Sequence, residues 1–582
     1  MDRRMTRALP STLSLALLLA FGPRASAVDI EFSEAPPRVV GKLEEGRAVP
    51  GAEEEPGLPF DLSLDYHTRL SYYDLHGNPS RAIKRQGWNY VQDLTLRIDH
   101  EVYDRLFLVG EGLFRHIEDP RLQSRAKRRQ LNENRLRFER GFLALERPDV
   151  FRAEAGDTLV NYNRFVLSRN LTVYPGAEAF LPVGDGRLRF AGLFGEEPEE
   201  QIGPIDRRQV AGGRVAMEKV APFLDTLGAT IAWSNDKDPD REAALAEDGT
   251  VYGTDGEVST PFDTVFYWDF AGSRVERESF TGGPSPLLRE FAWRTGARYS
   301  GPLGVNANLE YEEVQDGFRT VLGSAAPDTR SYRASVNVPL PEKVDWTFLY
   351  QFTQNNVDDK DRDTFFVQNF SSDARYRPLE GNANEALDSL AFTAGYGIAL
   401  RNSEKEVVRN QTDTYRTGFS IAKVWGFDFR ANYQRLEDRD HVTAATRHGN
   451  RTSGRAGYTW EFEKPELSVN PYHEFRYQDT SVGVRGRDGD VGRVREYIWG
   501  CDSRFLADYS AAWSYSLRFD DAIGGGNSGK EDRYRANFAY TPDIPWGDLR
   551  VGLDMSYNDV DADLDRFDFR DFEMGLTIDY HF

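Results

Sequence analysis

Cysteine is almost missing from this chain, because Cys501 is the one cysteine among 582 residues. A single cysteine excludes an intrachain disulfide, haem attachment through cysteines and an iron–sulfur cluster held by this chain alone. We interpret Cys501 as a structural residue, since nothing beside it in the sequence indicates an activated thiol. Stability must therefore come from backbone pairing and burial.

Long hydrophobic runs are also missing. After Phe21 no stretch is apolar for long enough to form a membrane-spanning helix. The mean hydropathy is −0.59, which is typical of a soluble protein. However, 13% of the residues are aromatic, with 37 Phe and 27 Tyr. Strands with one apolar and one polar face would explain both values, because hydropathy windows average the two faces.

The first residues have the pattern of an export signal. Arg3, Arg4 and Arg7 precede an apolar segment over 13–21, and the small residues 25–27 follow it. The apolar segment is too short to be a transmembrane anchor. We therefore predict that residues 1–27 are a cleaved signal peptide. Residues 28–59 are acidic and rich in Pro and Gly, and we expect a flexible segment there.

A period of two returns throughout the rest of the chain. In the last eleven residues, apolar side chains occupy every second position up to the terminal Phe582. This period is that of a strand with two different faces. Similar rows occupy 90–98, 346–352, 427–433, 456–462, 513–519, 534–540 and 549–557.

The connections between these rows alternate between short turns and long polar segments. This alternation and the amphipathic last strand resemble the outer-membrane β-barrel proteins of Gram-negative bacteria. The resemblance implies an outer-membrane location, contact with lipids and lipopolysaccharide, and insertion by the barrel assembly machinery. It also implies that Phe572, Ile578, Tyr580 and Phe582 form the signal that this machinery reads.

The predicted fold is all-β: a transmembrane, antiparallel, up-and-down barrel over residues 60–582, with short periplasmic turns and long extracellular loops. We predict about 24 strands, within a range of 20–26, because both ends of the barrel must face the periplasm. One of these strands is expected at 363–371. Residues 28–59 would be periplasmic.

Something must narrow so wide a lumen. Either the long segments 235–287 and 355–386 fold inward as constriction loops, with an aromatic wedge at 266–270, or a partner protein fills the lumen. A hairpin near 265–270 is the alternative. The segment 156–176, with Asn161, Asn163 and Asn170, is interpreted as a structured loop without an assigned ligand.

Charged side chains on the polar face of the rows are candidates for lining the lumen, because charge is costly on the lipid face. They form either a salt-bridged wall or a ladder that selects ions or substrates. The candidates are Arg97, Asp99, Asp428, Arg430, Arg455, Arg518, Asp520, Arg533, Arg535, Asp554, Glu573 and Asp579.

Other site chemistry is sparse. Asp236, Asp238, Asp240 and Glu247 loosely resemble a calcium loop, but Arg241 stands where the turn needs Gly, so we expect no metal. We expect no cofactor, and without a catalytic motif we expect no enzyme. The formal charge of −22 disfavours a nucleic-acid partner.

Two functions remain open. The first is a porin-like channel that passes small solutes or a polymer across the outer membrane. The alternative is a barrel that acts as a scaffold or sheath around a lumen-filling protein partner, as in the porin component of a porin–cytochrome electron conduit. The second resemblance rests on size and class alone.

Overall fold

The computed structural model describes the residues from Asp61 onward, with gaps at 78–86, 104, 118–136, 198–204, 240–246, 278–286, 321, 342, 358–362, 485–490, 507, 522–527, 546 and 563–567. The chain divides into Met1–Gly57 and Leu58–Phe582, and all described residues belong to the second unit. The predicted signal peptide at 1–27 and the predicted flexible segment at 28–59 lie outside the described residues.

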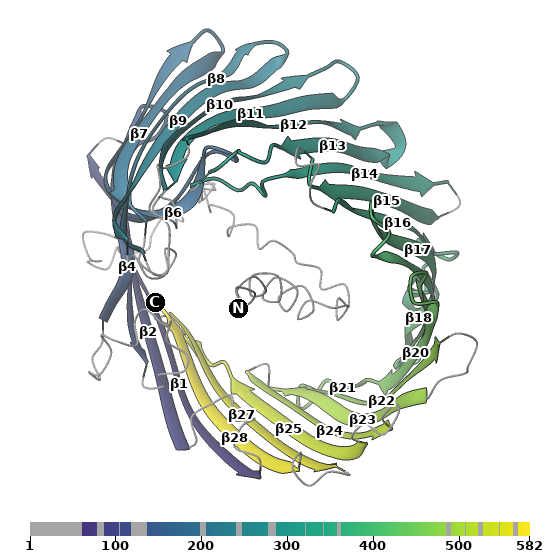
Figure 1. The fold of residues 1–582 in the computed structure, drawn as a ribbon. Helices are drawn as coiled ribbons and strands as arrows, with labels where there is room; N and C mark the ends of the chain where they lie inside the picture. Colours follow the sequence, from purple (N-terminus) through teal and green to yellow (C-terminus); the bar gives the residue numbers. More distant parts are fainter. Residues whose placement is uncertain are drawn as a thin grey trace, which may run out of the picture. The chain divides into compact units, whose positions relative to one another are not determined.

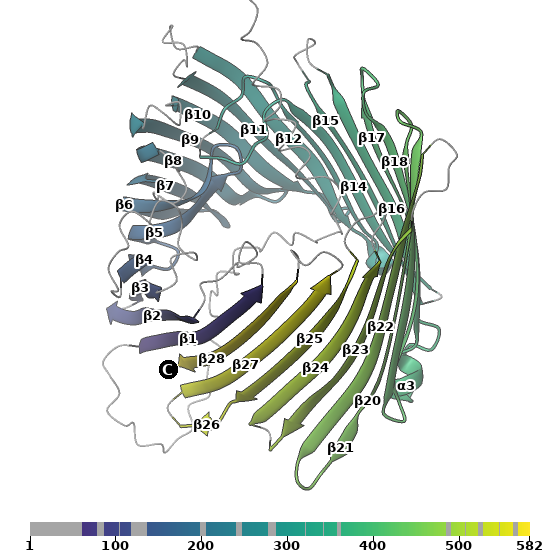
Figure 2. The ribbon, with the colours of Figure 1, turned by 60° about the horizontal axis from the view of Figure 1, so that its bottom comes forward.

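The described residues form one closed, antiparallel β-barrel (Figure 1). Each strand pairs with the next along the chain, and β1 (Asp61–Gly77) pairs with β28 (Phe569–His581) to close the ring. Of 28 strands, 26 make the ring, and β21 (Trp460–Phe462) and β26 (Asp543–Ile544) are short additions. The strands run obliquely around the ring (Figure 2).

The other strands have the following bounds: β2 Gly87–Tyr103, β3 Leu106–Ile117, β4 Arg137–Arg147, β5 Phe151–Asn163, β6 Leu167–Val183, β7 Gly186–Glu196, β8 Ile205–Ala221, β9 Leu224–Pro239, β10 Glu247–Ser259, β11 Thr264–Arg277, β12 Leu287–Ser300, β13 Asn306–Val314, β14 Thr329–Leu340, β15 Val344–Asn355, β16 Phe365–Tyr376, β17 Ala391–Ser403, β18 Arg409–Val424, β19 Phe427–Asp440, β20 Ala445–Tyr458, β22 Leu467–Val484, β23 Val491–Phe505, β24 Tyr509–Asp521, β25 Gly529–Tyr540 and β27 Gly547–Ala562.

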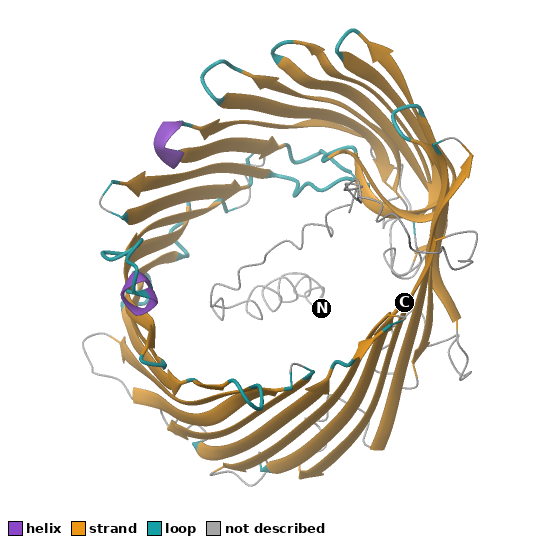
Figure 3. Ribbon diagram, turned by 180° about the vertical axis from the view of Figure 1, so that it is seen from behind, coloured by secondary structure: helices purple, strands orange, loops and turns teal. Residues whose placement is uncertain are grey.

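Helices are short and lie in connections (Figure 3). The 3₁₀ turn η3 (Pro302–Gly304) joins β12 to β13, and α3 (Glu385–Asp388) lies between β16 and β17. The Asn384 side chain caps α3 by accepting a hydrogen bond from the Ala386 amide. None of the helices in the described part is long and apolar enough to cross a membrane.

The carboxy-terminal strand is held along its whole length. Its register with β1 runs from Gly77 opposite Phe569 to Asp65 opposite His581. Phe582 continues the pairing, because its amide and carbonyl bond to those of Leu64 at 3.0 and 3.1 Å. The predicted terminal amphipathic strand is confirmed, and the ring has no free edge at its two ends.

The outer face of the ring is apolar and aromatic. Large side chains are exposed on it at alternate positions, among them Trp513, Phe538 and Leu576. Aromatic rings stack from strand to strand, with Trp499 and Tyr515 at 5.6 Å and Tyr515 and Tyr534 at 4.7 Å between centroids. An apolar belt on a fully paired sheet is what a bilayer requires, because lipid offers no hydrogen-bond partners.

The strand number exceeds the predicted value of about 24, because the ring has 26. The segment 235–287 is not one long loop, since it contains the end of β9 and all of β10 and β11. The sequence of β10 carries three glycines and few apolar residues, which weakens the period of two. The strand expected at 363–371 is present as β16.

The predicted constriction loops are therefore wrong. Phe266 and Phe270 belong to β11 and are exposed on the outer face, where Phe270 stacks on Phe291 at 5.5 Å. The described part of 355–386 contains all of β16 and a connection at the opposite end of the barrel from the long loops. Neither segment forms the apolar wedge that the sequence suggested.

The two faces of β16 provide a test of the membrane assignment. Phe370 lies in the middle of β16 on the outer face, and Ser371 is the next residue, on the inner face. Phe370→Arg should lower the free energy of unfolding in lipid vesicles by about 2–4 kcal/mol, because a charge at the midplane is poorly solvated. Ser371→Arg should change it by less than about 1 kcal/mol. Denaturant titration measures both, and equal losses would contradict the assignment of the faces.

Candidate functional site in the barrel lumen

A hairpin leaves the barrel wall and enters the lumen. β5 pairs with β4 from Phe151 to Gly156, and beyond Gly156 it has no partner in β4. Gly156 has φ of +111°, and a Cβ there would lie 2.2 Å from the carbonyl oxygen of Gly141. Only glycine fits this bend. The upper part of β5 and the start of β6 therefore turn inward as a pair (Figures 1 and 3).

The carboxylate of Asp157 holds the hairpin at the place where β5 leaves the barrel wall. Asp157 accepts hydrogen bonds from the Gly141 amide at 3.0 Å and from the Thr172 hydroxyl at 2.5 Å. It thus links β4, β5 and β6 immediately beyond the bend. A charged acceptor makes these bonds stronger than neutral ones.

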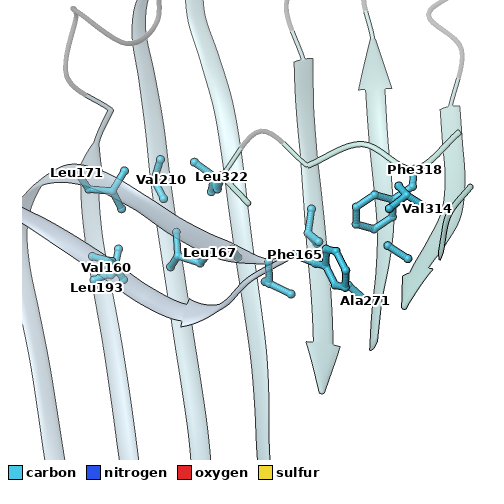
Figure 4. Packing of buried hydrophobic residues seen from close by; sticks show 14 of the residues in the cluster. Val160, Phe165, Leu167, Leu171, Leu193, Val210, Ala271, Val314, Phe318 and Leu322 are labelled. Carbon is cyan, nitrogen blue, oxygen red and sulfur yellow. The ribbon is translucent and has the colours of Figure 1, made fainter. Parts of the chain in front are cut away.

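The tip of the hairpin packs against the inner wall (Figure 4). Phe165, Val166 and Leu167 are completely buried, although they occupy the turn of a hairpin. Small apolar residues on consecutive strands form the surface that receives them. This wall row comprises Leu193, Val210, Ala232, Val251, Ala271, Ala292 and Val314.

Two glycines let the tip approach the wall closely. A Cβ at Gly212 would lie 2.6 Å from Cδ2 of Leu167, and a Cβ at Gly253 would lie 2.8 Å from Cγ2 of Val166. Both positions point inward on β8 and β10. This explains the weak pattern of β10: its inner face is shaped for contact with the hairpin and not for contact with water.

The connection between β13 and β14 holds the hairpin on its other side. The Ser168 amide donates to the Leu322 carbonyl at 2.9 Å, and the Ser324 amide donates to the Arg164 carbonyl at 2.8 Å. The rings of Phe165 and Phe318 meet edge to face at 6.3 Å. The contact of this connection with the hairpin was not predicted from the sequence.

The burial is large enough to keep the hairpin in place. Burying one Val, Leu or Phe side chain contributes about 1.5–3 kcal/mol. The three residues of the tip together contribute on the order of 5–8 kcal/mol by that measure. We name the inward part of the β5–β6 hairpin, residues 157–171, together with the segment 315–328, the inner shelf.

A charged row lies beside the wall row, one or two inward positions nearer the short turns. Arg214 on β8 makes two bonds of 2.6 Å to the carboxylate of Asp255 on β10 and also donates to the Tyr162 carbonyl. Asn163 donates to Asp255 at 3.1 Å. The side chains of Arg214 and Asp255 are 9% and 15% exposed, so water screens this pair weakly.

The row continues across the next strands. Arg294 on β12 lies 3.4 Å from Asp269 and 2.9 Å from Glu310. Tyr267 donates to Glu310 at 3.0 Å. At the tip, Arg164 forms an ion pair of 2.9 Å with Glu312. The shelf is thus held by apolar contacts on one side and by ion pairs on the other.

The predicted lumen residues share the face of the wall row. Directly opposite residues on paired strands point to the same face, so the register can be followed from Val314 around the ring. Contacts within this face include Arg97 with Glu111 at 3.0 Å, Arg518 with Asp520 at 3.0 Å, Glu573 with Arg69 at 3.2 Å and Asp579 with His67 at 2.5 Å.

Others of the set have different neighbours. Arg455 lies 3.8 Å from Asp502 and 3.9 Å from the ring centroid of Tyr472. Arg533 bonds to Glu531 at 2.5 Å, and Asp554 accepts from Asn537. The set as a whole comes from both sides of the ring, so it is spread around the lumen and not gathered. The role of these residues in selecting what passes stays a prediction.

The remaining predicted residues are placed as follows. Phe572, Ile578 and Tyr580 lie on β28 with Phe582 directly after it, and their part in insertion stays a prediction. The side chains of Asp236, Asp238, Asp240 and Glu247 lie outside the described residues. Within the described part, no group of three or more His, Cys, Asp or Glu side chains is arranged to hold a metal ion.

Sequence reasoning did not identify the shelf. The signal was present as Phe165, Val166 and Leu167, an apolar triplet between Asn163 and Asn170. In a barrel loop exposed to water such a triplet is unusual. The triplet could not be recognised as a buried contact from the sequence, because the residues of the wall row that bury it are distant in sequence.

The apolar contact of the shelf leads to a first prediction about the site. Phe165→Ala should raise hydrogen exchange of the amides at 157–171 by at least about a hundredfold, because such a core truncation costs about 3–5 kcal/mol. Phe190→Ala, on the outer face, is the matched control and should leave these amides unchanged. Equal effects of the two variants would show that the tip is not held by Phe165.

The ion pair of Arg214 leads to a second prediction. Asp255→Asn should lower the stability of the shelf by about 3–5 kcal/mol, because it leaves a buried guanidinium without its counter-ion. Replacing both partners, with Arg214→Met and Asp255→Leu, should lower it less than the single change does. Hydrogen exchange at 157–171 reports both, and additive losses would contradict the pairing.

Similarity to known proteins is found among solved structures alone. No family model matches the chain, and no curated protein matches it. Among solved structures, the E. coli P pilus tip assembly intermediate PapC-PapD-PapK-PapG matches with a TM-score of 0.47 and 10% identity, over 91% of this chain and 62% of that one. This chain therefore spans less than two thirds of the matched chain.

Two further structures are similar at the same level. The outer membrane transporter YddB from Escherichia coli has a TM-score of 0.37 and 9% identity, over 89% of this chain and 80% of that one. The outer membrane protein OprD from Pseudomonas aeruginosa has a TM-score of 0.32 and 13% identity, over 66% and 96%. The closed ring itself, with its apolar outer belt and charged inner face, identifies the chain as an outer-membrane β-barrel protein.

Proposed function

We propose that the chain forms a wide, water-filled channel that passes a hydrophilic polymer across the outer membrane. The observation that carries this proposal is a closed ring of 26 strands whose inner face is polar and charged. A charged inner face holds water, and so it favours a hydrophilic cargo over an apolar one.

The width of the ring supports a large cargo. Strands spaced by ~4.8 Å and tilted by ~40° give a round ring of 26 strands a backbone diameter of roughly 50 Å. The shelf occupies a layer of about 10 Å on one side. Side chains on both walls take up further space, so the remaining passage is on the order of 25 Å wide. Porins with 16–18 strands already form aqueous channels for small solutes.

The shelf supports a channel that is narrowed and not sealed. It lies against the wall from β7 to β13, and its contacts are made with these strands. Thr329 at the start of β14 and Asn356 just after β15 still bond to the shelf, at Ala326 and Asp328. The described residues from β16 to β27 contribute nothing to the apolar cluster that holds it. A polymer would therefore pass beside the shelf, along the free wall.

The alternative is a sheath around a protein partner. The same width favours it, because a passage of this order also holds a small folded domain. A sheath would need its partner for function, whereas a channel would conduct alone. We propose no catalytic role for either case.

The test is conductance in a planar bilayer with the purified full chain. The channel should open in large, steady steps, and polyethylene glycols with radii up to about 10 Å should enter and lower the conductance. Exclusion of even the smallest polymers would contradict a passage of this width. A silent barrel that co-purifies with an equimolar protein would favour the sheath.

A further inference from the structure

The lumen face divides into two sectors by what its arginines contact. From β1 to β13, most lumen arginines are engaged in ion pairs, among them Arg97 with Glu111 at 3.0 Å, Arg187 with Glu218 at 2.6 Å and Arg298 with Glu257. Arg140 on β4 is an exception, because it is exposed and has no such partner among the described residues. Most cations of this sector are therefore neutralised locally. The shelf covers part of the same sector.

From β14 to β27 the face carries arginines of another kind. Near the short turns lie Arg375 on β16, Arg430 on β19, Arg504 on β23 and Arg550 on β27. Their side chains are exposed, and none of the four makes an ion pair or hydrogen bond with another described residue. The register places all four on the lumen face.

The series extends to the other mouth of the barrel. Arg333 and Arg535 lie farther along β14 and β25, and Arg401 and Arg447 lie next to the long-loop ends of β17 and β20. These four are also exposed and unpaired among the described residues. We name the two groups of four together the arginine track. It runs along the wall that the shelf leaves free.

The carboxylates of this sector do not neutralise the positive charge of the arginine track. Asp373 pairs with Arg416, Glu496 with Arg476, and Asp520 with Arg518, so these acids already have counter-ions. Asp438 and Asp440 on β19 and Asp548 and Asp554 on β27 are acids of the same face without an ion pair among the described residues, and the eight arginines of the track outnumber them. The charge that is left for a passing molecule is therefore mainly positive, although the whole chain has a formal charge of −22.

The chemistry of the guanidinium group indicates the ligand. Arginine presents a planar fork of donors that fits carboxylate, sulfate and phosphate groups, and it is more weakly hydrated than lysine. Aromatic side chains of these strands lie mainly on the outer face, so the track lacks the stacking platforms that single-stranded nucleic acids use. Spaced anion sites without stacking match a charged polysaccharide.

We propose that the cargo of this barrel is an anionic polysaccharide and that the arginine track binds it during passage. This inference rests on the proposed channel function. Each contact is weak and exchangeable because the side chains are exposed, and this suits a cargo that must keep moving.

Block of the open channel by dextran sulfate tests the proposal. The full chain in a planar bilayer is titrated from the short-turn side with dextran sulfate and, separately, with neutral dextran of the same length. Dextran sulfate should block at a concentration about tenfold lower than neutral dextran, and added salt should weaken this block.

Two variants with equal charge change separate the track from general lumen charge. The track variant carries Arg430→Gln, Arg504→Gln and Arg550→Gln, and the control carries Arg97→Gln, Arg187→Gln and Arg298→Gln. The track variant should need about tenfold more dextran sulfate for half block, and the control should stay within about twofold of the unchanged chain. Both variants must show the same conductance without polymer.

The outcomes are distinct. A conducting barrel that dextran sulfate blocks no better than neutral dextran overturns the polysaccharide inference and leaves the channel intact. Equal shifts in the two variants overturn the track as the binding surface. A barrel that does not conduct overturns the channel, and the inference with it.

Discussion

The requirement that every backbone amide and carbonyl find a partner determines this molecule. Lipid provides no hydrogen bonds, so a sheet that spans the membrane must close on itself. The pairing of β1 with β28, continued by Phe582, meets this requirement at the ends of the chain. Once 26 strands are in the ring, strand spacing and tilt set its circumference and therefore its lumen. Width is thus a consequence of backbone pairing, and the side chains determine how that width is used.

The inner shelf follows from the same requirement. β5 can leave the wall because Gly156 accepts the bend and because β5 and β6 keep each other paired inside the lumen. The wall opposite then needs small side chains, which it has from β7 to β13. The shelf and the arginine track are accordingly complementary: one side of the lumen is filled and neutralised, and the other is open and positively charged.

The sequence was sufficient for the architecture, since the period of two depends only on local alternation. It predicted the two-faced strands, the even strand number and the terminal strand that ends at Phe582. It was insufficient where a strand faces protein on its inner side. Glu247–Ser259 lacks a clear alternation because Gly253 must admit Val166, a residue almost ninety positions earlier. The inward turn at Phe165 was missed for the same reason, because its burial depends on strands whose neighbours are known only after the ring closes.

The shelf also has a mechanical consequence. A ring of many strands bends easily, because its wall is a single sheet and each added strand lengthens the unsupported arc. The tip at Phe165 contacts residues from β7 to β13 and so ties one arc of the wall together from within. The shelf therefore stiffens this part of the wall against bending. Bending is then concentrated in the rest of the wall, so the barrel widens or narrows on the side where its cargo would pass.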